Sequence, residues 1–149
     1  MPNQLTSSTG TPAEVAGNLR VALMRTVRRL KRETDGEHSV SVVAALASVS
    51  KRGPLTLGEL AEAEGVSRPS MTVLAANLLE QDLVARELDE SDGRLVRVRI
   101  TPEGKRVLER SRTRRTAYLA KRLGNLSAEE LRTLDRAATI LLKLAEQGS

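Results

Sequence analysis

The residues best suited to chemistry in this sequence lie on one side of a predicted helix that spans residues 67–79. Their side chains are small, polar or cationic, and they are Ser67, Arg68, Pro69, Ser70, Thr72, Val73, Ala76 and Asn77. A helix face without bulk or negative charge can lie against base edges and phosphates in the major groove of duplex DNA. A solvent-exposed face without a ligand is the alternative that this stretch alone leaves open.

A second group of candidates lies on a predicted β-hairpin that follows this helix. Residues 84–89 and 94–101 alternate apolar and polar side chains, and an Asp-Gly pair between such strands is a strong hairpin signal. The group comprises Arg86, Asp92, Gly93, Arg94 and Arg97. Arg94 stands at the hairpin tip, where a guanidinium can enter a narrow minor groove with concentrated negative potential. These charges can alternatively prevent edge-to-edge aggregation, and the two roles are compatible.

Composition argues against catalysis and against metal binding. The 149 residues include no cysteine, one histidine, His38, and one aromatic residue, Tyr118. This excludes disulfides, thiol chemistry and a histidine-rich metal site within one chain, and the sequence has neither a phosphate-binding glycine loop nor an acidic pair in an apolar context. We therefore expect no catalytic residue, no metal and no cofactor. His38 could line a ligand pocket, although a surface position is the simpler interpretation.

The charge balance indicates a polyanionic partner. The chain has 24 Lys and Arg against 19 Asp and Glu, a formal net charge of +5, which suits nucleic acid or an anionic membrane surface. A single aromatic residue disfavours single-stranded nucleic acid, which is bound by stacking on several rings, so duplex DNA is preferred. No apolar run approaches membrane-spanning length, and a cytoplasmic protein without a membrane partner is expected. Residues 1–10 are polar and unlike a signal peptide, and we expect them to form a flexible arm.

Capping signals place the candidate face on the second helix of a helix-turn-helix. Thr56 and Glu59 form a capping box that starts the first helix, and Gly65 suits the left-handed conformation that ends it. Ser67 is the expected N-cap of the second helix, and Pro69 lies in its first turn, where its missing N–H costs nothing. The buried side of this helix would be formed by Met71, Leu74, Ala75, Leu78 and Leu79.

Long helices flank the helix-turn-helix on both sides. N-cap signals predict a helix within residues 11–34, a connecting helix over residues 102–123 and a last helix within residues 124–149. A shorter helix that supports the helix-turn-helix from behind begins at Ser39 or Ser41.

The first and last of these helices carry long apolar stripes that no other predicted element covers. Packing both stripes against the same helices of a second chain would bury them in an intermolecular bundle, and a twofold dimer is the commonest symmetry. The residues expected in this interface are Val15, Leu19, Leu23, Leu131, Leu134, Leu141 and Leu142. A hairpin formed by the two helices within a monomer is the alternative.

Residues 83–104 closely resemble the wing of MarR-family transcriptional regulators. In that family a Leu-Val pair and an Arg lead into an acidic turn with an Asp-x-Arg motif, a second strand and a Thr-x-x-Gly motif that opens the next helix. The matching positions here are Leu83, Val84, Arg86, Asp92, Arg94, Ile100, Thr101 and Gly104. Residues 53–72 are also similar to the family's helix-turn-helix, and the chain length and helix order match.

The resemblance implies a fold that is mainly α with a small β-hairpin wing (α+β). Residues 39–101 would form a winged helix-turn-helix, and the terminal helices would dimerise. The implied function is that of a homodimeric, sequence-specific DNA-binding transcriptional regulator on a pseudo-palindromic operator in a bacterial or archaeal nucleoid. The leading expectation is a repressor that leaves its DNA operator when a small-molecule effector binds. A winged helix that binds an acidic protein instead of DNA is the alternative.

Two positions depart from the family pattern. Val73 follows Thr72 where family members often have an arginine, so base contacts would depend more on Arg68, on Ser70 and on van der Waals contacts from Val73 and Ala76. Asp82 stands where a glycine often precedes the Leu-Val pair. It must end the helix without the conformational freedom of glycine, although Asp tolerates the left-handed region better than most residues.

Overall fold

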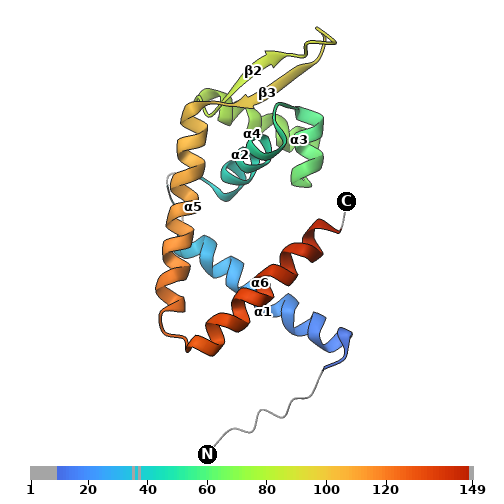
Figure 1. Ribbon diagram of the computed structural model, residues 1–149. Helices are drawn as coiled ribbons and strands as arrows, with labels where there is room; N and C mark the ends of the chain where they lie inside the picture. The colour runs from blue at the N-terminus through green and yellow to red at the C-terminus, as the bar shows by residue number, and fades with distance from the viewer. Residues whose placement is uncertain (1–9, 35, 37, 148–149) are drawn as a thin grey trace, which may run out of the picture.

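The structure is a computed structural model that describes residues 10–34, 36 and 38–147, so the predicted arm before Gly10 lies outside the described residues. In chain order the elements are α1 (Pro12–Glu33), α2 (Val40–Arg52), β1 (Leu55–Thr56), α3 (Leu57–Glu64), α4 (Arg68–Glu80), β2 (Val84–Leu88), β3 (Val96–Ile100), α5 (Pro102–Leu123) and α6 (Ala128–Glu146). Figure 1 shows two lobes joined by α5. One lobe contains α2, α3, α4 and the sheet, and the other contains α1 and α6.

The helix starts follow the capping signals of the sequence. Capping boxes begin α1 at Thr11, α3 at Thr56 and α6 at Ser127. Ser39, rather than Ser41, is the N-cap of α2. The predicted starts are confirmed because the unpaired N–H groups of a first turn need an acceptor, and these short polar side chains supply one. Among the described residues, no helix combines the length and the apolar character that crossing a membrane requires.

The sheet has three antiparallel strands in the order β1-β3-β2, which is one strand more than the predicted hairpin. On one edge of β3, Leu55 of β1 lies opposite Val98. On the other edge, Arg86 of β2 lies opposite the same residue. The sequence does not indicate β1, because a strand of two residues cannot show alternation and Thr56 within it is also the N-cap of α3.

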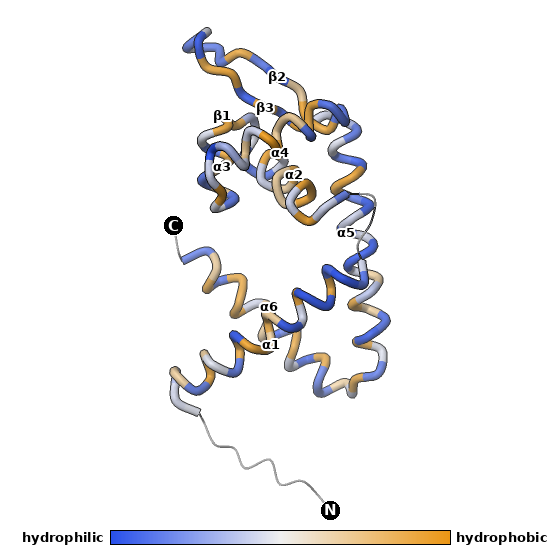
Figure 2. The backbone as a smooth tube through the Cα atoms, turned by 180° about the vertical axis from the view of Figure 1, so that it is seen from behind, coloured by the Kyte–Doolittle hydropathy of each residue, from blue (hydrophilic) through white to orange (hydrophobic). Residues whose placement is uncertain are grey.

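The hydrophobic core lies in the lobe of α2, α3, α4 and the sheet, and the first turns of α5 close it. Its members include Val42, Leu46, Leu60, Met71, Leu78, Leu83, Val98 and Val107. All residues of α1 and α6 are described, and none of them is buried. Figure 2 shows hydrophobic positions (orange) along both of these helices. The terminal helices therefore have apolar surface but no core of their own.

The end of α4 and the start of α5 are joined at the base of the hairpin. Asp82 has a φ of 56°, which confirms that it adopts the left-handed conformation expected there. The Thr101 hydroxyl donates to the carbonyl of Asp82 at 2.6 Å, and the same oxygen accepts from the N–H of Gly104 at 3.0 Å. A Cβ on Gly104 would lie 2.1 Å from the carbonyl oxygen of Leu83. Only glycine lets α5 approach the hairpin backbone this closely.

Gly104→Ala is expected to lower the free energy of unfolding by about 1–3 kcal/mol, because its methyl group would overlap the Leu83 carbonyl and push α5 away from the hairpin. Gly93→Ala is the matched control, since a Cβ there would meet no described atom within 4 Å. Its effect should stay within about 0.5 kcal/mol. Urea unfolding followed by circular dichroism compares the two variants, and equal stabilities would contradict the close approach.

Candidate nucleic-acid interface

The predicted face of α4 is free of contacts with the core. Ser67 and every α4 residue predicted on this face are exposed. Met71, Ala75 and Leu78 are buried on the opposite side of the helix. The structure thus confirms the division of α4 into a core side and a free side that the helical spacing predicted.

Short hydroxyl side chains line the start of α4. Ser67 accepts a hydrogen bond from the N–H of Ser70 at 3.3 Å and donates to the Ser70 hydroxyl at 2.9 Å. Thr72 donates its hydroxyl to the carbonyl of Arg68 at 3.0 Å. Of these three hydroxyl groups, Ser70 is therefore the one whose proton is not used within the helix. It is the hydroxyl best placed to donate to a phosphate.

The Arg68 side chain lies at the edge of the free face. A Cβ on Gly58 would lie 3.4 Å from a terminal nitrogen of Arg68, so the guanidinium extends over the first turn of α3. This position suits a phosphate contact better than the base contact that the sequence suggested, because phosphates border the groove whereas bases form its floor.

Arg86 and Arg94 are exposed cations on the hairpin. Neither belongs to an ion pair formed within the described residues. The backbone N–H of Arg94 donates to the Asp92 carboxylate at 3.0 Å, which orders the backbone at the hairpin tip. Both guanidinium groups are consequently available to a polyanion.

Arg97 is held differently from these two arginines. Its Nε donates to the Asp89 carboxylate at 2.6 Å, and its guanidinium also donates to the Glu59 carboxylate at 2.9 Å. The hydrogen bond to Asp89, together with the charge of Glu59, raises the pKa of Arg97. Only 25% of its side chain is exposed. This geometry does not leave Arg97 free for the predicted DNA contact; it connects the hairpin to the first turn of α3.

Asp89 organises the connection between β2 and β3. Its carboxylate accepts from the Ser91 hydroxyl at 2.6 Å and from the N–H groups of Ser91 and Asp92 at 2.9 and 3.0 Å. The Ser91 hydroxyl, with Arg97 and these N–H groups, holds the pKa of Asp89 well below its ordinary value. The connection covers residues 89–95 and is longer than the four residues, 90–93, that the predicted strand ends left between them, and Gly93 has no positive φ. Sequence reasoning missed Asp89, although an Asp two residues before a Ser is a signal for a side-chain-capped turn.

A helix-turn-helix followed by a cationic hairpin is an arrangement found in known regulators. Residues 39–95 match the model of the MarR family. An uncharacterized HTH-type transcriptional regulator of Mycobacterium leprae is 34% identical over 137 residues, which cover 91% of this chain and 96% of that protein. The chain belongs to the MarR family.

Two further comparisons agree with this assignment. The HTH-type transcriptional repressor MdtR of Bacillus subtilis is 35% identical over 101 residues, which cover 68% of this chain and 63% of that protein. The structure of a MarR family protein from Bacillus stearothermophilus matches with a TM-score of 0.76 and 25% identity, and it covers 92% of this chain and 99% of that one. These relatives are transcriptional regulators and not enzymes, and this MarR-family chain is a DNA-binding regulator.

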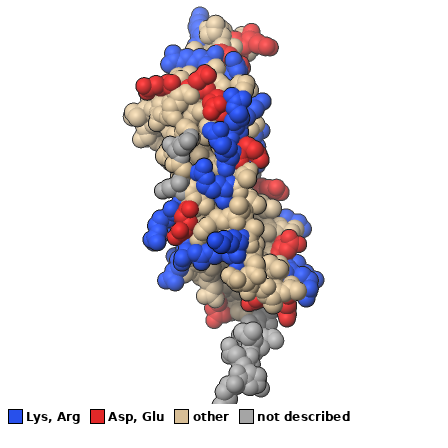
Figure 3. Space-filling model, turned by 90° about the vertical axis from the view of Figure 1, so that its left-hand side faces the viewer, with Lys and Arg blue, Asp and Glu red and all other residues tan. Residues whose placement is uncertain are grey.

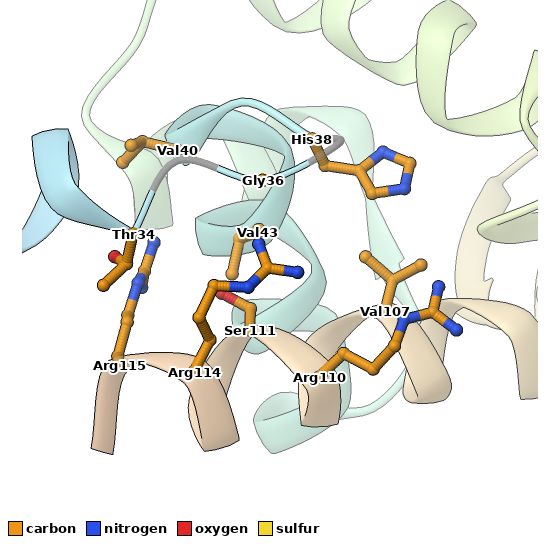
Figure 4. Close-up of a pocket in the computed structure, with 10 residues that line it drawn as sticks. All are labelled: Thr34, Gly36, His38, Val40, Val43, Val107, Arg110, Ser111, Arg114 and Arg115. Atoms are coloured by element: carbon orange, nitrogen blue, oxygen red, sulfur yellow. The ribbon is translucent and has the colours of Figure 1, made fainter. Parts of the chain in front are cut away.

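A small pocket of this MarR-family chain lies between α5 and the segment that joins α1 to α2. Figure 4 shows Arg110 and Arg114 on the α5 side of the pocket. His38 lies on the opposite side of the pocket, in the joining segment. His38 lines this pocket and is partly buried, and a role for it in ligand binding stays a prediction. The Arg110 guanidinium also contacts the Glu103 carboxylate at 3.6 Å. The pocket has a volume of about 20 Å³, which is room for about one water molecule.

Lys and Arg side chains gather along α5, which faces the viewer in Figure 3. Glu103 near the start of the helix pairs with Arg106 at 2.8 Å, and this partner lowers the pKa of Glu103. The basic surface therefore continues from the winged helix-turn-helix onto the connecting helix.

The predicted dimerisation residues are accessible on the single chain. Leu134 and Leu142 of α6 are 47% and 66% exposed. Three more of the predicted dimerisation residues are at least two-fifths exposed, namely Val15, Leu23 and Leu131. Leu19 and Leu141 are partly buried. In this single chain α1 and α6 do not bury both stripes against each other, as the monomeric alternative, a helical hairpin, would require.

Proposed function

We propose that this MarR-family regulator acts as a homodimer on a pseudo-palindromic duplex operator and represses transcription until a small-molecule effector releases it. The observation that carries the proposal is the pair of apolar stripes on α1 and α6, neither of which has a buried residue. They lie in one lobe, whereas the free face of α4 lies in the other (Figure 1). One lobe lacks a packing partner and the other presents a binding face.

A second copy of the chain is the partner that fits these stripes. An amphipathic helix gains most of its stability by burying its apolar side, and a twofold axis would bring the same stripes together from both chains. The two copies of α4 would then enter successive major grooves about 34 Å apart. Such spacing calls for an inverted repeat in the operator.

On each half-site, α4 and the wing would hold one DNA strand between them. A groove of about 310 Å³ separates α4 from the sheet, and its lining includes Leu57, Thr72, Ala76, Arg86 and Val96. With α4 in the major groove and Arg94 in the adjacent minor groove, the sugar-phosphate strand would pass along this groove. Its apolar walls suit deoxyribose, and Arg86 suits a phosphate oxygen.

The name of one relative supports repression, and the pocket beside α5 is the site that we propose for release. The Bacillus subtilis relative is named a repressor. The pocket beside α5, at about 20 Å³, is too small for an organic molecule, so a ligand that binds must separate α5 from the segment before α2. Such a ligand would prefer an opened arrangement, and this difference in affinity would shift the two copies of α4 and release DNA. We infer that the regulator works in the bacterial cytoplasm, at the nucleoid.

Leu134→Glu is expected to dissociate the dimer and to abolish specific DNA binding, because a carboxylate in the α6 stripe would be buried without a partner. Thr139→Glu is the matched control, since it adds the same charge to an exposed position about 140° around the same helix. Light scattering gives the mass and anisotropy titration gives the affinity. A monomeric Leu134→Glu protein that binds as tightly as the unmodified protein would refute the twofold arrangement.

Arg94→Ala should weaken duplex binding by about 1–3 kcal/mol and reduce the salt dependence by about one phosphate contact. Arg132→Ala removes the same charge from α6 and should change neither quantity. Anisotropy titrations over a series of salt concentrations measure both. If the purified protein showed no salt-dependent affinity for duplex DNA, the alternative of a winged helix that binds an acidic protein would replace this proposal.

Salicylate, a small phenolic carboxylate, is a suitable probe of release. At saturation it is expected to weaken operator binding by about 5- to 150-fold without dissociating the dimer. Arg114→Ala should abolish most of this response, because that guanidinium lines the pocket. Lys121→Ala, farther along the same helix, should retain it. Unchanged operator affinity in the presence of salicylate would remove phenolic carboxylates from the proposal.

A further inference from the structure

The hydrocarbon side chain of Val73 occupies the centre of the free face of α4. Val73 is 73% exposed, whereas Met71 and Ala75, two residues before and after it, are buried. Since each residue turns an α-helix by about 100°, both buried neighbours lie roughly 200° around the helix from Val73. Val73 therefore points directly away from the core. Pro69 and Ala76, about one turn away on either side, extend the apolar centre.

Nothing in the fold calls for a valine at this position. A branched side chain is a weaker helix former than Ala, Leu or Lys, because it loses rotamer freedom against the preceding turn. An exposed valine contributes no core packing in return. The side chain gains free energy only when a ligand covers it.

Charge surrounds this apolar centre but does not enter it. The side chains between Pro69 and Asn77 on the free face are uncharged. Arg68 extends toward α3, and Arg86 lies across the groove that separates α4 from the sheet. A duplex has the complementary arrangement, with phosphates at the edges of the major groove and base edges on its floor. The apolar centre of α4 then meets the bases.

We propose that Val73 is a specificity-determining residue that contacts the C5-methyl group of thymine. Of the groups that the four bases present in the major groove, this methyl group is the apolar one, and the other recognition groups are hydrogen-bond donors or acceptors. Each operator half-site would therefore carry a thymine beneath the middle of α4, with Ala76 completing the contact. This inference rests on the proposed placement of α4 in the major groove.

Replacement of thymine by deoxyuridine tests the contact, because it removes the methyl group and keeps the base pair. A duplex is first selected from a random pool with the full-length protein, and each thymine of a half-site is then replaced in turn. At one position at least, the substitution should weaken binding about fourfold, which is what burial of one methyl group contributes. Anisotropy at fixed ionic strength gives the dissociation constants.

Two variants assign the effect to the side chain. Val73→Ala should bind the thymine and the deoxyuridine duplex with similar affinity at that position. Val66→Ala, which shortens another exposed valine just before α4, should retain the fourfold difference. Thermal unfolding of Val73→Ala should occur at or above the temperature of the unmodified protein, because alanine is the better helix former.

The outcomes separate this inference from the proposed function. Specific duplex binding that no deoxyuridine substitution weakens would overturn the role of Val73 and leave the operator model standing. The same holds if Val73→Ala keeps the full difference, or if the selected half-site lacks thymine. Absence of any preferred duplex would overturn the operator model and this inference together.

Discussion

A single hydroxyl group connects the end of α4 to the start of α5, the helix that joins the two lobes. Thr101 donates to the carbonyl of Asp82, where α4 has just ended, and its oxygen also caps the first turn of α5. Gly104 lets the backbone of α5 lie against Leu83 at the base of the wing. Because α5 is one continuous helix of 22 residues, a rotation of the lobe of α1 and α6 in the proposed homodimer would be transmitted to this junction and from there to α4. The spacing of the two copies of α4 in the proposed homodimer would thus be controlled from the far lobe.

The wing arginines Arg86, Arg94 and Arg97 differ in whether a carboxylate holds them. Arg97 is committed to Asp89 and Glu59, which hold the hairpin at a defined orientation to α3. Arg86 and Arg94 are exposed. The acidic residues of the wing serve the same end, since Asp89 and Asp92 accept hydrogen bonds from the turn and from Arg97. In the proposed DNA complex, carboxylates that would otherwise repel phosphates would thus stabilise the hairpin that carries Arg86 and Arg94.

Local signals in the sequence were sufficient for the helices and for the two sides of α4. A cap or a left-handed residue depends on a few neighbouring positions, which is why Ser67 and Asp82 were predicted correctly. Local signals could not show which wing arginines pair with carboxylates and which stay exposed. Arg86 and Arg97 both occupy polar positions of alternating strands, but of the two only Arg97 pairs with Asp89 and with Glu59, which is 38 residues away in the chain. Contacts over such separations appear only once the fold is assembled.

The helices α1 and α6, all of whose residues are described, have no core of their own. In the proposed homodimer the stability of the regulator therefore depends on its concentration. In the proposed homodimer, a newly synthesised subunit would complete its winged lobe alone and would expose the apolar stripes of α1 and α6 until it met another copy. In the proposed assembly the encounter rate rises with the square of subunit concentration, and stability rises with it by mass action. Scarce subunits would spend longer as targets for chaperones and proteases. Below a threshold of synthesis the cell would thus clear the regulator, and above it a durable pool would form.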